Sequence, residues 1–249
     1  MTDQHCADPA WGSPEWRHAA HRWALARLAD RGATSVGPMA DVSVQAWSAV
    51  WRLPTTLGPV VVKQTTAGRA AEIAVHAACA RFAPEFVSPP LATDVAGHRL
   101  LLCDGGPTLD QHHPAIPPTL ATDLIRDYAS FQRATAEHRG DLLAAGCPTW
   151  DPAAAADELE SLVTALTDLP TSDLRHLTAA QRDVLLDNRQ AYRRAGATLA
   201  ASALPECLDH GDLWPGSPVS SRQWTPTCKP GRTSWRPATA EPCWPTPRS

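Results

Sequence analysis

Two stretches of the 249-residue sequence carry residue types and spacings that can do chemistry. The first runs from Leu208 to Ser217, reads Leu-Asp-His-Gly-Asp-Leu-Trp-Pro-Gly-Ser, and contains a His-Gly-Asp core. The second is the apolar run that starts at Pro59 and ends near Lys63, which is the only lysine among the first 216 residues. A carboxylate such as that of Asp212 can orient a hydroxyl group or bind a metal ion. The simpler interpretations are an ordinary turn, which Gly and Asp favour, and a lysine in solvent at a strand end.

The first stretch resembles the catalytic loop of the aminoglycoside phosphotransferase and choline kinase-like families, which are distant relatives of the protein kinases. Those families read H-G-D-x-x-x-x-N, close to the kinase pattern H-R-D-x-x-x-x-N. The resemblance implies that Asp212 orients or deprotonates the hydroxyl group of an acceptor, and that His210 braces the loop. Ser217 stands where those families place the asparagine that binds Mg²⁺, so the sequence departs from the pattern at this metal position.

The same resemblance assigns a role to Lys63, which ends a β-branched strand as the lysine of V-A-I-K does in kinases. An ammonium group there would bind the phosphates of ATP as a compact point charge. Glu72 lies nine residues later on an expected helix and would pair with Lys63, although a helix glutamate in solvent has the same spacing. The segment around Asp104 resembles the hinge between two lobes. Its residues that would bind adenine, mainly through backbone groups, are Leu102, Cys103 and Asp104.

Hydrophobic periodicity predicts the elements that position these residues. We expect helices over 14–31, 66–81, 118–138, 153–166 and 178–204, and strands over 42–53, 59–64, 91–94 and 98–103. A loop over 45–48 would take the place of a glycine-rich phosphate loop. Strands followed by helices predict an α+β fold. The resemblance implies a protein-kinase-like arrangement of two lobes, with a small β-rich N-lobe and an α-rich C-lobe whose C-terminal part is missing.

The expected domain organisation has four parts. Residues 1–35 form an N-terminal helical segment, residues 36–103 the N-lobe, and residues 104–216 the C-lobe that ends in the catalytic loop. Residues 217–249 contain seven prolines and three tryptophans but no Leu, Ile, Met, Phe or Tyr. Such a composition has no core-forming pattern, so we expect a non-native or disordered tail. A frameshift near codons 216–217 explains the change of composition, and a natural basic tail is the alternative.

The predicted function is an ATP-dependent phosphotransferase that acts on a small-molecule hydroxyl group, such as that of an antibiotic, a sugar or an amino alcohol. ATP and Mg²⁺ are the cofactors that the resemblance implies. Because Ser217 replaces the asparagine and no second metal-binding aspartate follows, catalysis is expected to be impaired. A catalytically inactive nucleotide-binding protein is the alternative. A metal-dependent hydrolase that uses His210, Asp212 and the neighbouring pair His112 and His113 is a third interpretation.

Composition narrows the classes of partner. A formal net charge of −4 is too small to indicate nucleic acid or a membrane surface as a partner. No apolar run reaches the ~18 residues that cross a bilayer, and residues 1–10 do not resemble a secretion signal, so a cytoplasmic protein is expected. The seven cysteines contain no C-x-x-C pair, which favours reduced cysteines over a disulfide framework or a zinc site. The sequence does not indicate an oligomeric state.

Overall fold

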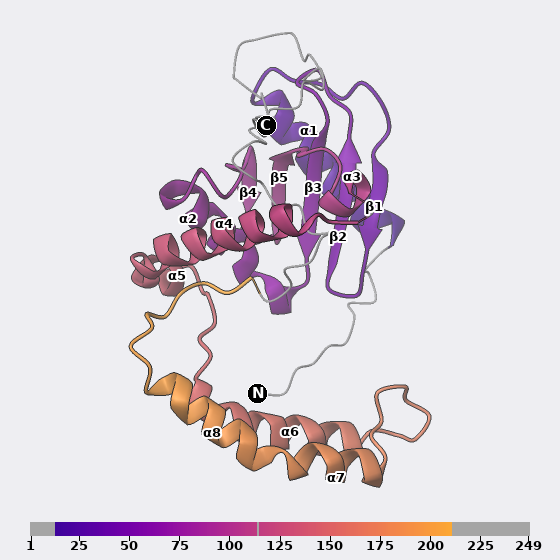
Figure 1. Cartoon of the computed structure of the whole chain (residues 1–249). Helices are drawn as coiled ribbons and strands as arrows, with labels where there is room; N and C mark the ends of the chain where they lie inside the picture. The colour runs from indigo at the N-terminus through magenta and orange to yellow at the C-terminus, as the bar shows by residue number, and fades with distance from the viewer. Residues whose placement is uncertain (1–12, 114, 211–249) are drawn as a thin grey trace. The chain divides into compact units, whose positions relative to one another are not determined.

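The computed structural model describes residues 13–113 and 115–210, and it combines an antiparallel sheet with helices (Figure 1). The five strands have the spatial order β1-β2-β3-β5-β4, and every neighbouring pair is antiparallel. This mixture of sheet and helix agrees with the α+β class expected from the sequence. The strands are β1 (Ala40–Val44), β2 (Ser48–Leu53), β3 (Val60–Thr65), β4 (Ala92–Asp94) and β5 (Arg99–Cys103).

The helices match most of the segments that hydrophobic periodicity predicts. In the described part of the chain, no helix has the length and apolar character needed to cross a membrane. The α-helices are α1 (Pro14–Ala29), α2 (Ala71–Phe82), α3 (Leu109–His112), α4 (Pro118–Ala136), α5 (Arg139–Ala144), α6 (Ala155–Thr167), α7 (Ala179–Asp187) and α8 (Arg189–Ala200). The short 3₁₀ helices are η1 (Ala67–Arg69) and η2 (Pro152–Ala154).

The described chain divides into two compact units. Residues 13–147 together with 207–210 form the first unit, and residues 148–206 form the second. The first unit contains the whole sheet and helices α1 to α5, whereas the second contains α6, α7 and α8. The domain boundaries expected after residues 35, 103 and 216 stay predictions.

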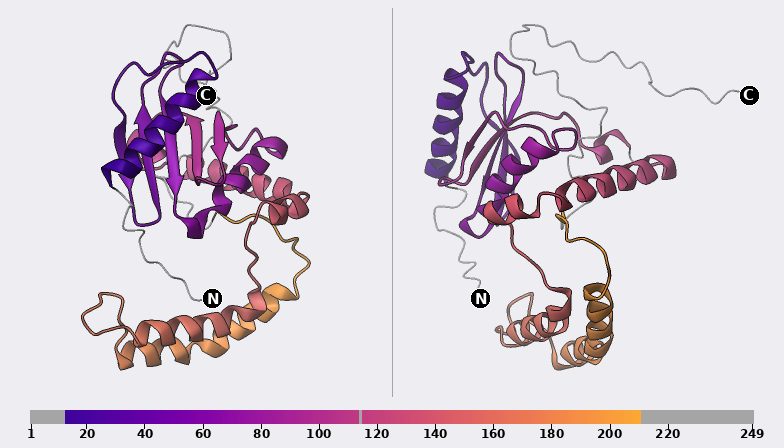
Figure 2. Two further views of the ribbon diagram at one scale, coloured as in Figure 1. Left: turned by 180° about the vertical axis from the view of Figure 1, so that it is seen from behind. Right: turned by 90° about the vertical axis from the view of Figure 1, so that its left-hand side faces the viewer.

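The core of the first unit lies between α1 and one face of the sheet (Figure 2). Because successive side chains of a strand point to opposite faces, Val60 and Val62 of β3 face this core and are fully buried. Trp51 of β2 lies beside Val62 and is only 1% exposed. Helix α1 packs closely on the sheet because alanines line its buried side, and its buried residues are Ala20, Ala24 and Leu28.

The expectation of one strand over 42–53 is wrong, because the chain turns back within it. Strands β1 and β2 form a hairpin whose turn is closed by a hydrogen bond from the Gln45 amide to the Ser48 carbonyl oxygen, at 2.8 Å. The turn Gln45-Ala46-Trp47 contains no Gly, Pro, Asn or Asp, so the usual sequence signal for a turn is absent. The hairpin therefore places residues 45–48 at one end of the sheet, where a loop was expected.

The single helix expected over 178–204 is also wrong, because α7 and α8 are separate helices joined at Asn188. The Asn188 side-chain amide donates a 2.8 Å hydrogen bond to the Val184 carbonyl oxygen. That carbonyl is the one that the Asn188 backbone amide would use in an uninterrupted α-helix, and the backbone amide instead reaches Leu185. Competition of this kind is the reason that asparagine favours helix ends over helix interiors.

Candidate functional site

Lys63 lies on the face of the sheet opposite α1. Its strand position alternates with those of Val62 and Gln64, so its side chain emerges on the second face, where α2 lies (Figure 2). The residues directly beside it are Val50 of β2 and Leu100 of β5. The Lys63 side chain is 29% exposed. The structure therefore places its ammonium group at the edge of an apolar surface that solvent can reach.

Glu72 forms an ion pair with Lys63. After β3 the chain turns through η1 and returns as α2, which brings the first turn of α2 back to the sheet. The Glu72 carboxylate is 34% exposed and lies in the first turn of α2, where the helix dipole favours a negative charge. The contact that the resemblance implied between Lys63 and Glu72 is present. The ion pair therefore joins β3 to the first turn of α2.

The β1–β2 turn is attached to the connection between β3 and α2. The Thr66 amide donates to the Trp47 carbonyl oxygen at 3.1 Å, and the Arg69 guanidinium lies 6.0 Å from the centre of the Trp47 ring. A cation at this distance from an aromatic face is attracted by the ring. These contacts fix the turn next to the segment that leads from Lys63 to Glu72.

The hinge residues expected to bind adenine lie where β5 ends, beside the start of β3. Leu102 and Cys103 end β5 and pair with Val61 and Val60 of β3. The Asp104 amide donates to the Pro59 carbonyl oxygen at 3.0 Å, which extends the ladder by one residue beyond β5. The backbone of the hinge is therefore fixed against β3.

Asp104 has side-chain contacts that the sequence analysis did not anticipate. Its carboxylate is 7% exposed and accepts a 3.0 Å hydrogen bond from the Gly106 amide. Arg52 of β2 forms an ion pair with it, with 2.5 Å between Arg52 Nε and Asp104 Oδ2. Gly106 has a φ of +85°, which suits glycine in a tight turn. The Asp104 side chain thus shapes the hinge, and any contact with adenine there would use the backbone.

Asp212 and Ser217 lie outside the described residues, so the structure does not place them relative to Lys63. The three residues before Gly211 are described, and they lie along α4. Leu208 donates its amide to the Thr135 hydroxyl at 3.1 Å, and His210 donates its amide to the Tyr128 hydroxyl at 2.8 Å. The stretch that resembles a catalytic loop, Leu208 to Ser217, therefore starts from a segment that belongs to the same unit as Lys63 and Glu72.

No protein-family model matches the sequence, and no curated protein matches it. A solved structure named macrolide 2'-phosphotransferase type I is similar to this chain, with a TM-score of 0.49 and 17% sequence identity. The likeness covers 80% of this chain and 66% of that chain, so this chain spans about two-thirds of the length of that protein. The functional interpretation accordingly depends on the geometry of the chain's own residues.

His76 lies one turn after Glu72 on α2 and is mostly buried. Its Nε2 donates to the Ser88 carbonyl oxygen at 2.8 Å, since a carbonyl can only accept. Burial lowers the pKa of His76 below its ordinary value of 6.5, and the positive charge of Lys63 lowers it further. The Ser88 hydrogen bond and the Glu72 carboxylate act in the opposite direction. The net effect keeps His76 neutral near neutral pH.

We expect the wild-type protein to lose stability in mildly acidic solution because of His76. Its folded-state pKa is lower than its unfolded-state pKa, so the stabilisation is present above pH 6.5 and is lost as the pH falls through the folded-state value. His76→Gln keeps a donor for Ser88 without a titrating ring. Urea unfolding of both proteins between about pH 7.5 and about pH 5 should show a steeper loss in the wild type. Parallel curves would contradict the prediction.

The described residues contain no group of three or more His, Cys, Asp and Glu side chains arranged to hold a metal ion. Two residues of the hydrolase interpretation, Asp212 and the side chain of His112, lie outside what the structure describes. Ser217, which stands at the Mg²⁺ position of the kinase-like interpretation, lies outside it as well. The metal position therefore stays a prediction from the sequence.

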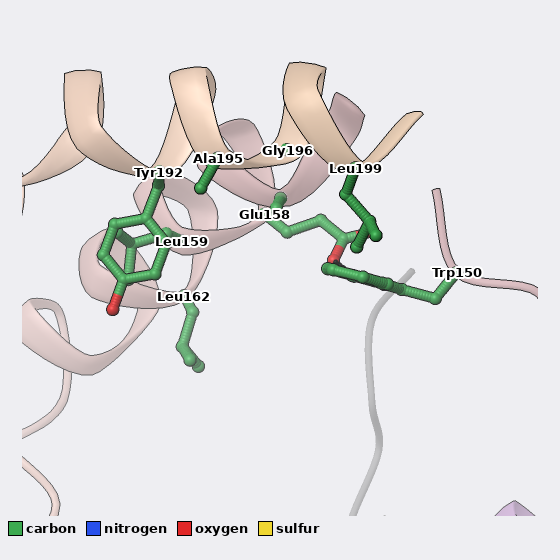
Figure 3. A pocket seen from close by; sticks show the side chains of 9 residues that line it. Trp150, Glu158, Leu159, Leu162, Tyr192, Ala195, Gly196 and Leu199 are labelled. Carbon is green, nitrogen blue, oxygen red and sulfur yellow. Dashed lines mark hydrogen bonds between the residues drawn. The ribbon is translucent and has the colours of Figure 1, made fainter. Parts of the chain in front are cut away.

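The second unit has an apolar groove of about 410 Å³ between α6 and α8 (Figure 3). Trp150 lies at one end of this groove, and its indole Nε1 donates to Glu158 Oε2 at 2.8 Å. Nothing in the described structure shows what covers the groove. Its lining residues are Trp150, Ala155, Glu158, Leu159, Leu162, Tyr192, Ala195, Gly196 and Leu199.

Proposed function

We propose that this chain has the architecture of an ATP-dependent phosphotransferase for a small-molecule hydroxyl group, and that its catalysis is impaired in the present sequence. The observation that carries the proposal is the ion pair between Lys63 and Glu72 on the face of the sheet opposite the α1 core. An ammonium group that follows the apolar run of β3 and is held by a helix carboxylate fits the binding of nucleotide phosphates. The segment that leads to Asp212 belongs to the same unit.

Each residue has a distinct part in this proposal. Lys63 binds the phosphates, and Glu72 keeps the Lys63 side chain extended. The backbone of Leu102, Cys103 and Asp104 holds the adenine. Bound ATP and Mg²⁺ supply the phosphoryl group and neutralise its charge. Asp212 orients the acceptor hydroxyl and takes up its proton.

The residues present fit ATP better than they fit Mg²⁺. Lys63 offers a positive charge that solvent can reach, and the end of β5 offers a backbone that is fixed against β3. Ser217 is a weaker magnesium ligand than a carboxylate, and residues 217–249 contain one acidic residue, Glu241, and no aspartate. We therefore propose nucleotide binding with slow phosphoryl transfer. The second candidate is a nucleotide-binding protein without turnover. Ser217, in place of the asparagine of the resembling families, favours this candidate.

The sequence allows a direct test because it contains two lysines, Lys63 and Lys229. An ATP analogue with an acyl group on its terminal phosphate transfers that group to a nearby lysine amine and forms an amide. We expect preferential acylation of Lys63, and ATP at ten times its Kd should slow this reaction about tenfold. Lys229 serves as the internal control, and mass spectrometry measures both sites. Equal labelling of Lys63 with and without ATP would contradict nucleotide binding.

Release of ADP separates the two candidates. Slow ADP formation that disappears in Asp212→Ala, with Lys63 protection unchanged, supports phosphoryl transfer through Asp212. Protection of Lys63 without ADP formation supports the nucleotide-binding protein without turnover. Assays with an antibiotic, a sugar and an amino alcohol then identify the acceptor by the increase in ADP formation.

A further inference from the structure

Two hydroxyl groups of α4 bind consecutive parts of the segment that precedes the catalytic aspartate. Tyr128 donates its hydroxyl proton to Asp209 Oδ1 at 2.7 Å and accepts the His210 amide at 2.8 Å. Thr135 accepts the Leu208 amide at 3.1 Å and donates to the Gln132 carbonyl oxygen at 2.8 Å. Both hydroxyl groups therefore act as donor and as acceptor. Both contacts of the Tyr128 hydroxyl, and the acceptor contact of the Thr135 hydroxyl, require the segment in this position.

The spacing of these contacts fixes the direction of the segment. Tyr128 and Thr135 are seven residues apart, which is two helical turns and about 10 Å along one side of α4. Leu208 bonds to the later helix residue and His210 to the earlier one, so the segment runs antiparallel to α4. Thr135 is fully buried, which makes its hydrogen bonds costly to lose.

Helix α4 is itself attached to the part of the protein that follows α2. The ring of Phe131, between the two hydroxyl residues, lies 5.8 Å from the ring of Phe86 in an edge-on arrangement. Phe82, at the end of α2, stacks on His138 with 4.2 Å between ring centres. Glu72 lies in the first turn of α2 and pairs with Lys63. The two ring contacts join the other end of α2, and the residues after it, to α4 and the residues that follow α4. The Lys63 ion pair is therefore connected through α2 and α4 to the segment that leads to Asp212.

We infer that Tyr128 and Thr135 are positioning residues, which hold residues 208–210 along α4 and so give the His210-Gly211-Asp212 segment a fixed starting point. This inference rests on the proposed function, in which Asp212 meets the acceptor hydroxyl. Asp212 follows His210 by two residues, so an extended chain limits the distance between their Cα atoms to ~7 Å. A fixed His210 therefore restricts where the carboxylate can be, which is a condition for aligning it with a hydroxyl group.

The chemistry of a phenol suits this position. The tyrosine side chain has only two rotatable torsions, so its hydroxyl can hold a backbone amide with little loss of side-chain conformational entropy. Burial raises the pKa of Tyr128 to about 12, and the hydrogen bond to Asp209 contributes to this shift. The hydroxyl therefore keeps its proton near neutral pH and remains both donor and acceptor.

Hydrogen exchange of single amides tests the inference. Tyr128→Phe removes the hydroxyl, and we expect the His210 amide to exchange about tenfold faster, which corresponds to the loss of one hydrogen bond. Thr135→Val should have the same effect on Leu208. Tyr192→Phe, at the other tyrosine of the chain, is the matched control and should leave both amides unchanged. An unchanged His210 amide in Tyr128→Phe would overturn the inference.

A second pair of variants applies if Tyr128→Phe loosens the whole unit, which would appear as faster exchange throughout α4 and β3. Asp209→Asn keeps an oxygen that accepts from Tyr128, whereas Asp209→Leu does not. We expect the His210 amide to exchange within about twofold of the wild-type rate in Asp209→Asn and about tenfold faster in Asp209→Leu. Equal rates in these two variants would overturn the inference.

Labelling of Lys63 separates this inference from the proposed function. A positioning role predicts that ATP protects Lys63 equally well in Tyr128→Phe and in the wild type, and that any ADP formation has a lower kcat at an unchanged KM for ATP. If ATP does not protect Lys63 even in the wild type, nucleotide binding fails. The exchange rates of Leu208 and His210 still decide whether α4 holds the segment.

Discussion

Replacing Lys63 with methionine is expected to weaken ATP binding by about tenfold or more and to leave the fold intact. A hydrogen bond to a charged phosphate contributes about 1.5–3 kcal/mol, and methionine cannot make it. The apolar part of the side chain is retained, so the contacts with Val50 and Leu100 should persist. Titration calorimetry with ATP measures the effect, and thermal unfolding checks the fold.

The matched control for this substitution is Arg175→Met. Arg175 also forms an ion pair, with Asp173 at 2.7 Å, but it belongs to the second unit. Removing its charge should leave ATP affinity within about twofold of the wild type if a specific phosphate contact of Lys63, and not the net charge of the protein, determines binding. If Lys63→Met and Arg175→Met weakened ATP binding equally, the net charge of the protein would determine ATP affinity and a specific contact between Lys63 and the phosphates would not.

Glu72 provides a further check on the same site. If Glu72 acts by holding Lys63, Glu72→Gln should weaken ATP binding in the wild-type background and have little effect in Lys63→Met. Such non-additivity in a double-mutant cycle is the sign of two residues that act together. Additive effects would show that Glu72 contributes independently of the lysine.

Trp51→Ala is expected to destabilise the first unit by about 3–5 kcal/mol, the range for removing a buried aromatic side chain. Trp51 is 1% exposed and lies in the core between α1 and the sheet, and the centre of its ring lies 5.0 Å from the centre of the Trp16 ring. Its loss leaves a cavity that the closely packed alanines of α1 cannot fill. Urea unfolding measures the change in free energy.

Trp150→Ala is the control for this second prediction. Trp150 is 57% exposed and belongs to the second unit, so its removal should cost about 1 kcal/mol or less. If the two tryptophan variants were equally stable, the buried cluster around Trp51 would not be the main support of the sheet. The comparison also indicates whether the two units unfold separately, because each substitution removes a side chain from a different unit.

The parts of the site that could be predicted from the sequence are those with local signals. A β-branched run predicted β3 with Lys63 on it, and the next apolar periodicity predicted the helix that carries Glu72. The pairing of Glu72 with Lys63 was implied only by the family resemblance, because the spacing fits a glutamate in solvent equally well. Ser13 followed by Pro14 is a local signal for the start of α1, and the Ser13 hydroxyl accepts the Trp16 amide at 3.2 Å. These features depend on residues close together in the chain.

The parts that could not be predicted depend on contacts between distant residues. Tyr128 and Asp209 are 81 residues apart, and Arg52 and Asp104 are 52 apart, so no local pattern connects them. The one available signal for the former was the seven-residue spacing of Tyr128 and Thr135, which places two hydroxyl groups on the same side of a helix. A loop was expected at residues 45–48, but the sequence did not show that it joins two antiparallel strands, because this turn lacks the usual turn residues.

The division of the chain at residues 147 and 207 has a consequence for the order of events during synthesis. Residues 13–147 leave the ribosome first and can form the sheet and α4, whereas residues 207–210 emerge only after the whole second unit. Helix α4 must therefore keep Tyr128 and Thr135 accessible until then. If residues 148–206 fold by themselves in the meantime, they shorten the effective loop that must be closed and lower its entropic cost. The segment that leads to Asp212 is thus the last part of the first unit to reach its place.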